Sequence, residues 1–100
     1  MNALQAEVST PSSKLTLLAF ENDWCAQCYT ERPIIQKVAE EYAGQLLVQS
    51  VNVTTDTTLS DLYKIKTAPS IVFIKDGLVV EKITRFIDHD QLDRVIRYYL

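Results

Sequence analysis

The chain has 100 residues, 47% hydrophobic and 23% charged, so its length and composition predict one globular domain with a single core. Its formal net charge is −3 and it has no basic run, which argues against binding to nucleic acid or to an anionic membrane surface. No apolar stretch approaches the roughly 20 residues of a membrane span, and residues 1–7 lack the charged and apolar regions of a secretory signal. We therefore expect a protein of the reducing cytoplasm, although the mature form of an exported protein has the same features.

The first thirteen residues are expected to precede the domain as a separate segment. Residues 2–8 are compatible with a short helix, and residues 9–13 have the Ser, Thr and Pro composition of a linker. The domain is then predicted to cover residues 14–100. It begins with residues 15–20, which are nearly all apolar and so predict a strand buried on both faces, as in the centre of a parallel sheet.

A helix that runs to about Ala43 is predicted after the first strand. Apolar residues with helical spacing mark its buried side: Ile34, Ile35, Val38, Ala39 and Tyr42. Gly44 is a suitable residue just beyond its end. Pro33 falls inside the segment and removes one backbone hydrogen bond, so we expect a kinked helix, with two helices broken at Arg32 as the alternative.

The second half of the chain predicts a strand and a short helix, followed by a hairpin and a last helix. Residues 46–53 fit a strand, parallel to the first because a helix connects them, and residues 57–63 fit a short helix. Residues 70–75 and 78–83 predict a hairpin, because Asp76-Gly77 supplies the positive φ angles of its tight turn. Asp88, with Gln91 three residues on, is predicted to cap the last helix. Its buried residues are expected to be Leu92, Val95, Ile96 and Tyr99. The order predicts an α/β fold with a four-stranded mixed sheet and helices on both faces.

The only two cysteines of the chain lie three residues apart, in Trp24-Cys25-Ala26-Gln27-Cys28, where the first strand gives way to the helix. This spacing brings both sulfurs together across one helical turn, and the start of a helix favours a thiolate on Cys25. The pattern predicts a redox-active pair. The alternatives are two core cysteines or a passive disulfide, which stabilises little when it closes so small a loop. No metal is expected, because a closed zinc site needs four ligands and only the distant His89 could join the pair.

The pair and its surroundings resemble the thioredoxin family over residues 15–100. The resemblance is carried by four features that fall in the family's places: Trp24-Cys25-x-x-Cys28, Pro33 in the helix, Thr67-Ala68-Pro69 before a strand, and Asp76-Gly77 in the hairpin. It implies a thioredoxin-like fold, whose first edge strand is expected to be absent because the chain before Leu15 is short. It also implies that Cys25 attacks, that Cys28 resolves the mixed disulfide, and that Pro69 is cis beside the sulfurs.

The family's function is the corresponding expectation for this chain: a thiol–disulfide oxidoreductase that reduces, and can isomerise, protein disulfides. The resemblance implies no cofactor beyond the Cys25–Cys28 disulfide itself. Its expected partners are protein disulfide substrates and a thioredoxin-reductase-like or other dithiol electron donor, and the protein is expected to be a monomer. Contacts with the substrate are expected from Trp24, Ala26, Gln27, Ala68, Pro69, Arg85 and Phe86.

Several positions depart from the family pattern. Ala26-Gln27 replaces the usual Gly-Pro, and Arg85, followed by Phe86, replaces a glycine of the substrate groove. The family's buried aspartate and its lysine partner are replaced by the uncharged residues Ala19 and Ser50. The group that accepts the proton of the resolving thiol is therefore either missing or supplied elsewhere.

The candidates that the sequence offers for this proton acceptor are Glu21 and Asp23, whereas Glu31 and Arg32 are expected on a solvated helix face and His89 on the surface. The departures also motivate an alternative function. In that interpretation the chain is a docking or redox-sensing adaptor with a thioredoxin fold and little turnover.

Overall fold

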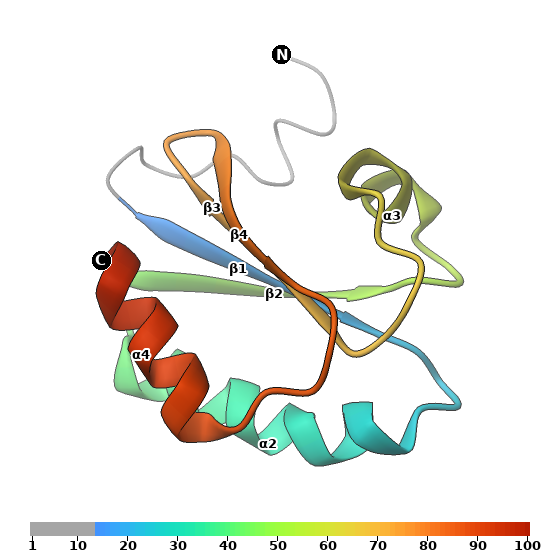
Figure 1. Ribbon diagram of the computed structural model, residues 1–100, viewed down its shortest axis with the longest axis horizontal. Coiled ribbons are helices and arrows are strands. Elements are labelled where there is room, and N and C mark those ends of the chain that lie inside the picture. Colours follow the sequence, from blue (N-terminus) through green and yellow to red (C-terminus); the bar gives the residue numbers. More distant parts are fainter. Residues whose placement is uncertain (1–13) are drawn as a thin grey trace.

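The structure is a computed structural model that describes residues 14–100, so the helix predicted at 2–8 and the linker at 9–13 lie outside the described residues. Figure 1 shows the described elements around one twisted sheet. In chain order they are β1 (Leu15–Glu21), α2 (Ala26–Glu41), β2 (Leu46–Asn52), α3 (Thr57–Tyr63), β3 (Ser70–Lys75), β4 (Leu78–Ile83) and α4 (His89–Tyr99). None of the helices within residues 14–100 has the length and apolar character needed to cross a membrane.

The sheet has the strand order β2-β1-β3-β4, which confirms the predicted four-stranded mixed sheet. β1 runs parallel to β2, to which α2 connects it, and antiparallel to β3. β3 and β4 form the predicted antiparallel hairpin. The central position of β1 explains its nearly continuous apolar sequence, because helices cover the sheet on both faces.

The core has two layers, one on each face of the sheet. α2 and α4 cover one face and α3 covers the other (Figure 1). Alternate residues of β1 face the two layers: Leu17 packs with the α2 and α4 side, and Leu18 with the α3 side. Both are fully buried, so the strand predicted to be buried on both faces is confirmed.

α2, the helix that begins at the cysteine pair, is continuous from Ala26 to Glu41 with Pro33 inside it. The alternative of two helices broken at Arg32 is therefore wrong. A proline at this place removes one N–H but leaves the hydrogen bonds on both sides, which hold the helix together. The helix ends two residues earlier than predicted because Tyr42 leaves the helical conformation, with φ −112° and ψ 27°. Its hydroxyl donates a hydrogen bond to Asp93 of α4.

Local sequence signals account for the hairpin and for the start of α4. Asp76 and Gly77 have φ angles of +54° and +79°, as the tight turn between β3 and β4 requires. The side chain of Asp88 accepts a hydrogen bond of 2.9 Å from the backbone N–H of Gln91, which confirms the predicted helix cap. Both features depend on a few adjacent residues, which is why the sequence alone predicted them.

Candidate redox site

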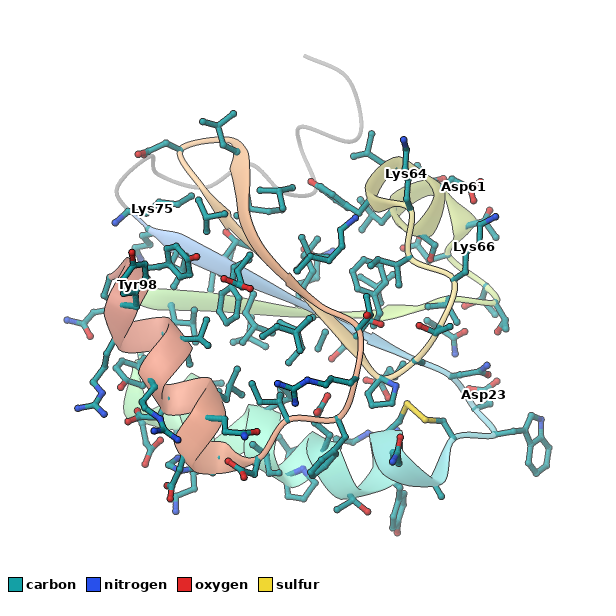
Figure 2. The ribbon with its side chains drawn as sticks, in the orientation of Figure 1. Asp23, Asp61, Lys64, Lys66, Lys75 and Tyr98 are labelled. Carbon is teal, nitrogen blue, oxygen red and sulfur yellow. A yellow bond between two sulfur atoms is a disulfide. The ribbon has the colours of Figure 1, made fainter. Side chains whose placement is uncertain are left out.

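Cys25 and Cys28 form a disulfide at the start of α2, with their Cα atoms 5.2 Å apart. Figure 2 shows the sulfur–sulfur bond in yellow at the N-terminal end of this helix, close to Asp23. Cys25 is the N-cap residue, and its Sγ accepts a hydrogen bond of 3.0 Å from the backbone N–H of Cys28. The same N–H and the positive end of the helix dipole would stabilise negative charge on Cys25 after reduction.

The two sulfur-bearing residues differ in their access to solvent. Cys28 is only 3% exposed, whereas Cys25 is half-buried. A partner molecule can therefore reach the outer cysteine more easily than the inner one.

The segment before β3 lies directly beside the outer sulfur. Sγ of Cys25 is 3.6 Å from the carbonyl oxygen of Ala68, and the Ala68–Pro69 peptide bond is cis. Pro69 is buried and lines the same pocket as Cys28. Two segments that are 43 residues apart in the chain thus meet at Cys25.

The residues flanking the cysteines form an exposed surface. Trp24 is 96% exposed, and Ala26 and Gln27 are exposed on the first turn of α2. The loop that carries Trp24 is held at its preceding residue, because the side-chain N–H of Asn52 donates a hydrogen bond of 2.9 Å to the Asp23 carboxylate. The indole is therefore presented to solvent by the loop between β1 and α2, which is tethered to the end of β2.

Arg85 and Phe86 lie on the loop between β4 and α4. Arg85 is exposed and donates a hydrogen bond of 3.0 Å to the carbonyl oxygen of Phe86, which is half-buried. The next residue, Ile87, donates its backbone N–H to Glu31 of α2 over 2.8 Å. This hydrogen bond fixes the loop against α2, one turn after Cys28.

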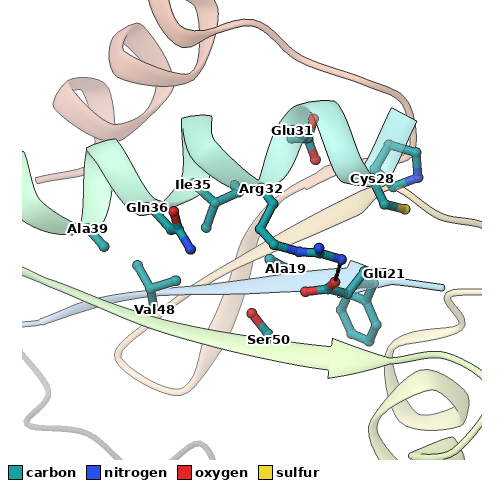
Figure 3. A pocket seen from close by; sticks show the side chains of 12 residues that line it. Ala19, Glu21, Cys28, Glu31, Arg32, Ile35, Gln36, Ala39, Val48 and Ser50 are labelled. Carbon is teal, nitrogen blue, oxygen red and sulfur yellow. Dashed lines mark hydrogen bonds and ion pairs between the residues drawn. The ribbon is translucent and has the colours of Figure 1, made fainter. Parts of the chain in front are cut away.

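A pocket of about 270 Å³ lies between α2 and the sheet, behind the inner cysteine. Figure 3 shows Cys28, Glu31 and Arg32 on α2 around this pocket, with Ala19 and Ser50 on the strands opposite. Ala19 and Ser50 are register partners on β1 and β2. Because neither side chain carries a charge, these two positions offer no carboxylate to take a proton from Cys28.

The two acidic residues that the sequence suggested as replacements are engaged elsewhere. Glu21 lines the pocket, but its carboxylate forms an ion pair of 2.6 Å with Arg32, which Figure 3 shows as a dashed line. Asp23 is exposed and accepts the hydrogen bond from Asn52.

Glu31 is the functional candidate that the sequence interpretation missed. It was expected on a solvated face, but it is only 3% exposed, so that expectation is wrong. Desolvation raises the pKa of its carboxyl group, and the hydrogen bond from Ile87 partly opposes this shift. The signal was present in the spacing, because Glu31 falls between Cys28, Ile35 and Val38, the other buried residues of α2.

His89 does not join the cysteines. It hydrogen-bonds over 2.8 Å to Glu41 at the far end of α2, and this bond is the main reason that the pKa of His89 is raised. It is half-buried rather than a free surface residue. Within residues 14–100 no group of three or more His, Cys, Asp or Glu side chains is placed to hold a metal ion.

Comparison with known proteins agrees with this geometry. The family model described as thioredoxin matches residues 2–98. The chain is 31% identical to a thioredoxin of Chlorobaculum thiosulfatiphilum over 72% of this chain and 67% of that one. It is 32% identical to thioredoxin 2 of Chlorobaculum tepidum, over 79% of this chain and 72% of that one. It spans a smaller share, 50%, of thioredoxin-T from Drosophila melanogaster.

A solved structure supports the same assignment. A mutant thioredoxin from Halobacterium salinarum superposes with a TM-score of 0.84 at 25% sequence identity, covering 99% of this chain and 86% of that one. The fold, the match over nearly the whole chain and the cysteine pair at the start of α2 agree with one another. The chain belongs to the thioredoxin family, whose members are thiol–disulfide oxidoreductases that work through their own disulfide.

Proposed function

We propose that this chain reduces, and can isomerise, disulfides of protein substrates by cycling between the Cys25–Cys28 dithiol and disulfide. The observation that carries the proposal is the asymmetry of the pair, with an accessible sulfur at the helix N-terminus and a shielded one a turn inside. The family membership supports the same reaction. No cofactor is needed, because the electron pair is stored in the two sulfurs.

The proposed cycle has two attacks. The Cys25 thiolate attacks a substrate disulfide, forming a mixed disulfide and releasing one substrate thiolate. Cys28 then loses its proton and attacks Sγ of Cys25, which closes the Cys25–Cys28 disulfide and releases the second substrate thiolate. A thioredoxin-reductase-like enzyme or another dithiol donor returns the pair to the reduced state. We propose that the protein acts as a monomer in the cytoplasm.

Substrate binding is proposed for the surface around the outer sulfur. The carbonyl oxygen of Ala68 is proposed to pair with the backbone of an extended substrate segment, which its distance of 3.6 Å from Sγ of Cys25 supports. Trp24 offers an apolar contact on the other side of the cysteines. The remaining proposed contacts are Ala26, Gln27, Pro69, Arg85 and Phe86.

Replacement of each cysteine tests the proposed function. Cys25→Ser should abolish the reduction of insulin disulfides, because no accessible thiolate remains to attack the substrate disulfide. Cys28→Ser should instead accumulate a mixed disulfide at Cys25, detectable by mass spectrometry of the unreduced protein. Full insulin reduction by the Cys25→Ser variant would contradict the proposed role of Cys25.

A second candidate function is a docking or redox-sensing adaptor with little turnover. It is favoured by the uncharged pair Ala19 and Ser50 behind Cys28 and by the arginine on the loop after β4. Steady-state turnover with a thioredoxin reductase and NADPH separates the two functions. Sustained turnover supports the enzyme, whereas stoichiometric capture of a disulfide protein without turnover supports the adaptor.

A further inference from the structure

We propose that the Glu31 carboxyl group exchanges the proton with the Cys28 thiol, in place of an acidic residue on the sheet. The inference rests on the proposed function, because it concerns the second attack of the proposed cycle. Glu31 is 3% exposed, and the one hydrogen bond that it receives within residues 14–100 comes from the backbone N–H of Ile87 to Oε1. A buried carboxylate without a basic partner costs free energy, which calls for a role beyond packing.

The position of Glu31 relative to Cys28 supplies the first argument. Both side chains are 3% exposed, both belong to the first two turns of α2, and both line the pocket between α2 and the sheet. Residues three apart in a helix are neighbours, with Cβ atoms about 5–6 Å apart. A glutamate side chain is long enough for its carboxyl group to reach a thiol at this spacing, directly or through one water molecule.

The charges around Glu31 supply the second argument. Across the pocket, Glu21 and Arg32 are paired with each other over 2.6 Å. On the loop after β4, Arg85 is bonded to a backbone carbonyl group, and Asp88 caps α4. None of these groups is bonded to Glu31 in the described residues. Burial is therefore the main influence on its proton affinity and raises the pKa of the carboxyl group, partly opposed by the hydrogen bond from Ile87.

The step balances as a single proton transfer coupled to disulfide exchange. In the mixed disulfide, the Glu31 carboxylate takes the proton from the Cys28 thiol, and the resulting thiolate attacks Sγ of Cys25. The bond between Cys25 and the substrate sulfur breaks, and its electron pair leaves on the substrate thiolate. Glu31 ends protonated, and it returns the proton to Cys28 when a donor dithiol later reduces the pair.

The reaction of the reduced protein with 5,5′-dithiobis(2-nitrobenzoate) isolates this step in a stopped-flow instrument. The first release of thionitrobenzoate reports the attack by Cys25 and depends on reagent concentration. The second release reports the attack by Cys28, and its rate does not depend on reagent concentration. Because the aromatic thiolate leaves without needing a proton, the second phase depends on how Cys28 loses its own proton.

Glu31→Gln is the decisive variant, because the amide oxygen can still accept the hydrogen bond from Ile87 but cannot take a proton. We expect its second phase to be at least about tenfold slower at pH 7, in the range of general base catalysis, with the first phase unchanged. In the parent protein the second phase should level off above the pKa of Glu31. In the variant it should keep rising with pH until the thiol itself ionises.

Two matched controls make the result specific. Glu40→Gln removes the same charge from an exposed position of α2, and Glu21→Gln removes the other carboxylate that lines the pocket. Both should keep the parent pH profile of the second phase. An unchanged second phase in Glu31→Gln, or an equal loss in either control, would overturn the assignment. Absence of the first phase in the parent protein would instead refute the proposed function.

A measurement on the unaltered chain avoids dependence on how the variant folds. NMR titration of the protein with ¹³C-labelled glutamate carboxyl groups should give a Glu31 pKa that differs between the disulfide and dithiol states. Such a change is expected only if the carboxyl group interacts with the thiol that appears on reduction. The same Glu31 pKa in both states would overturn the inference, and Glu40 provides the internal reference.

Discussion

At the scale of single residues, Glu31 is the side chain whose placement conflicts most with its chemistry. Its side chain is buried, and within residues 14–100 its carboxyl group receives one backbone hydrogen bond. The loop that gives this bond also carries Arg85 and Phe86, two of the proposed substrate contacts. The residue therefore links the interior of the site to its outer surface.

The raised pKa of Glu31 predicts a pH-dependent loss of stability. A carboxyl group whose pKa is higher in the folded than in the unfolded state stabilises the fold fully below the unfolded value of 4.5, and this contribution is lost as pH rises through the folded pKa. Glu31→Gln has no carboxyl group to ionise at this position. The free energy of unfolding of the variant minus that of the parent protein should therefore increase from pH 4 to pH 8. Urea unfolding at a series of pH values measures the difference. A constant difference across this range would contradict the prediction.

At the scale of elements, the start of α4 depends on one side chain. Asp88 accepts the N–H of Gln91, and its neighbour Ile87 gives the hydrogen bond to Glu31, so the cap and the contact with α2 are adjacent. Asp88→Ala removes the cap and should lower the free energy of unfolding by about 1 kcal/mol. Asp88→Asn, which keeps an acceptor oxygen, should lose much less. Equal stabilities of the two variants in urea unfolding would show that the cap contributes nothing.

The elements also show what could be predicted from the sequence. The hairpin and α3 are confirmed with the predicted bounds, because turn residues and short-range spacing determine them. The sequence predicts that α2 ends near Ala43, two residues beyond its end in the structure, because Tyr42 continues the apolar spacing while its hydroxyl bonds to α4. That bond depends on the packing of two helices distant in sequence, which local patterns do not contain.

The site was predictable to a similar degree. The cysteine pair at the start of α2 followed from its spacing and its place after β1. The pocket behind Cys28 and the burial of Glu31 did not, because both depend on how α2 lies across β1 and β2. The helical spacing places Glu31 on the buried side of α2, but a glutamate is usually assigned to the surface, and the sequence does not contain the hydrogen bond from Ile87 that its carboxyl group receives there.

At the scale of the whole molecule, the two core layers share one sheet, so neither is expected to be stable without the other. Leu59 of α3 and Ile96 of α4 are both fully buried, on opposite faces. Replacement of either by alanine should lower the free energy of unfolding by about 2–5 kcal/mol. Each variant should still unfold in a single transition, because both layers rest on the same strands.

Urea unfolding followed by far-UV circular dichroism checks this prediction. The matched control is Leu62→Ala, a change of the same kind on α3 at a position that is 47% exposed, which should cost less than about 1 kcal/mol. Two separate transitions in either core variant would mean that the layers unfold independently.

The exposure of Trp24 has a practical consequence for the study of partner binding. It is the only tryptophan of the chain, and 96% of it is open to solvent in the folded protein. Its fluorescence in the free protein is therefore already that of a hydrated indole, and a partner that covers the ring should shift the emission to shorter wavelength. The chain thus carries its own optical reporter of complex formation, next to the sulfur where the chemistry is proposed to begin.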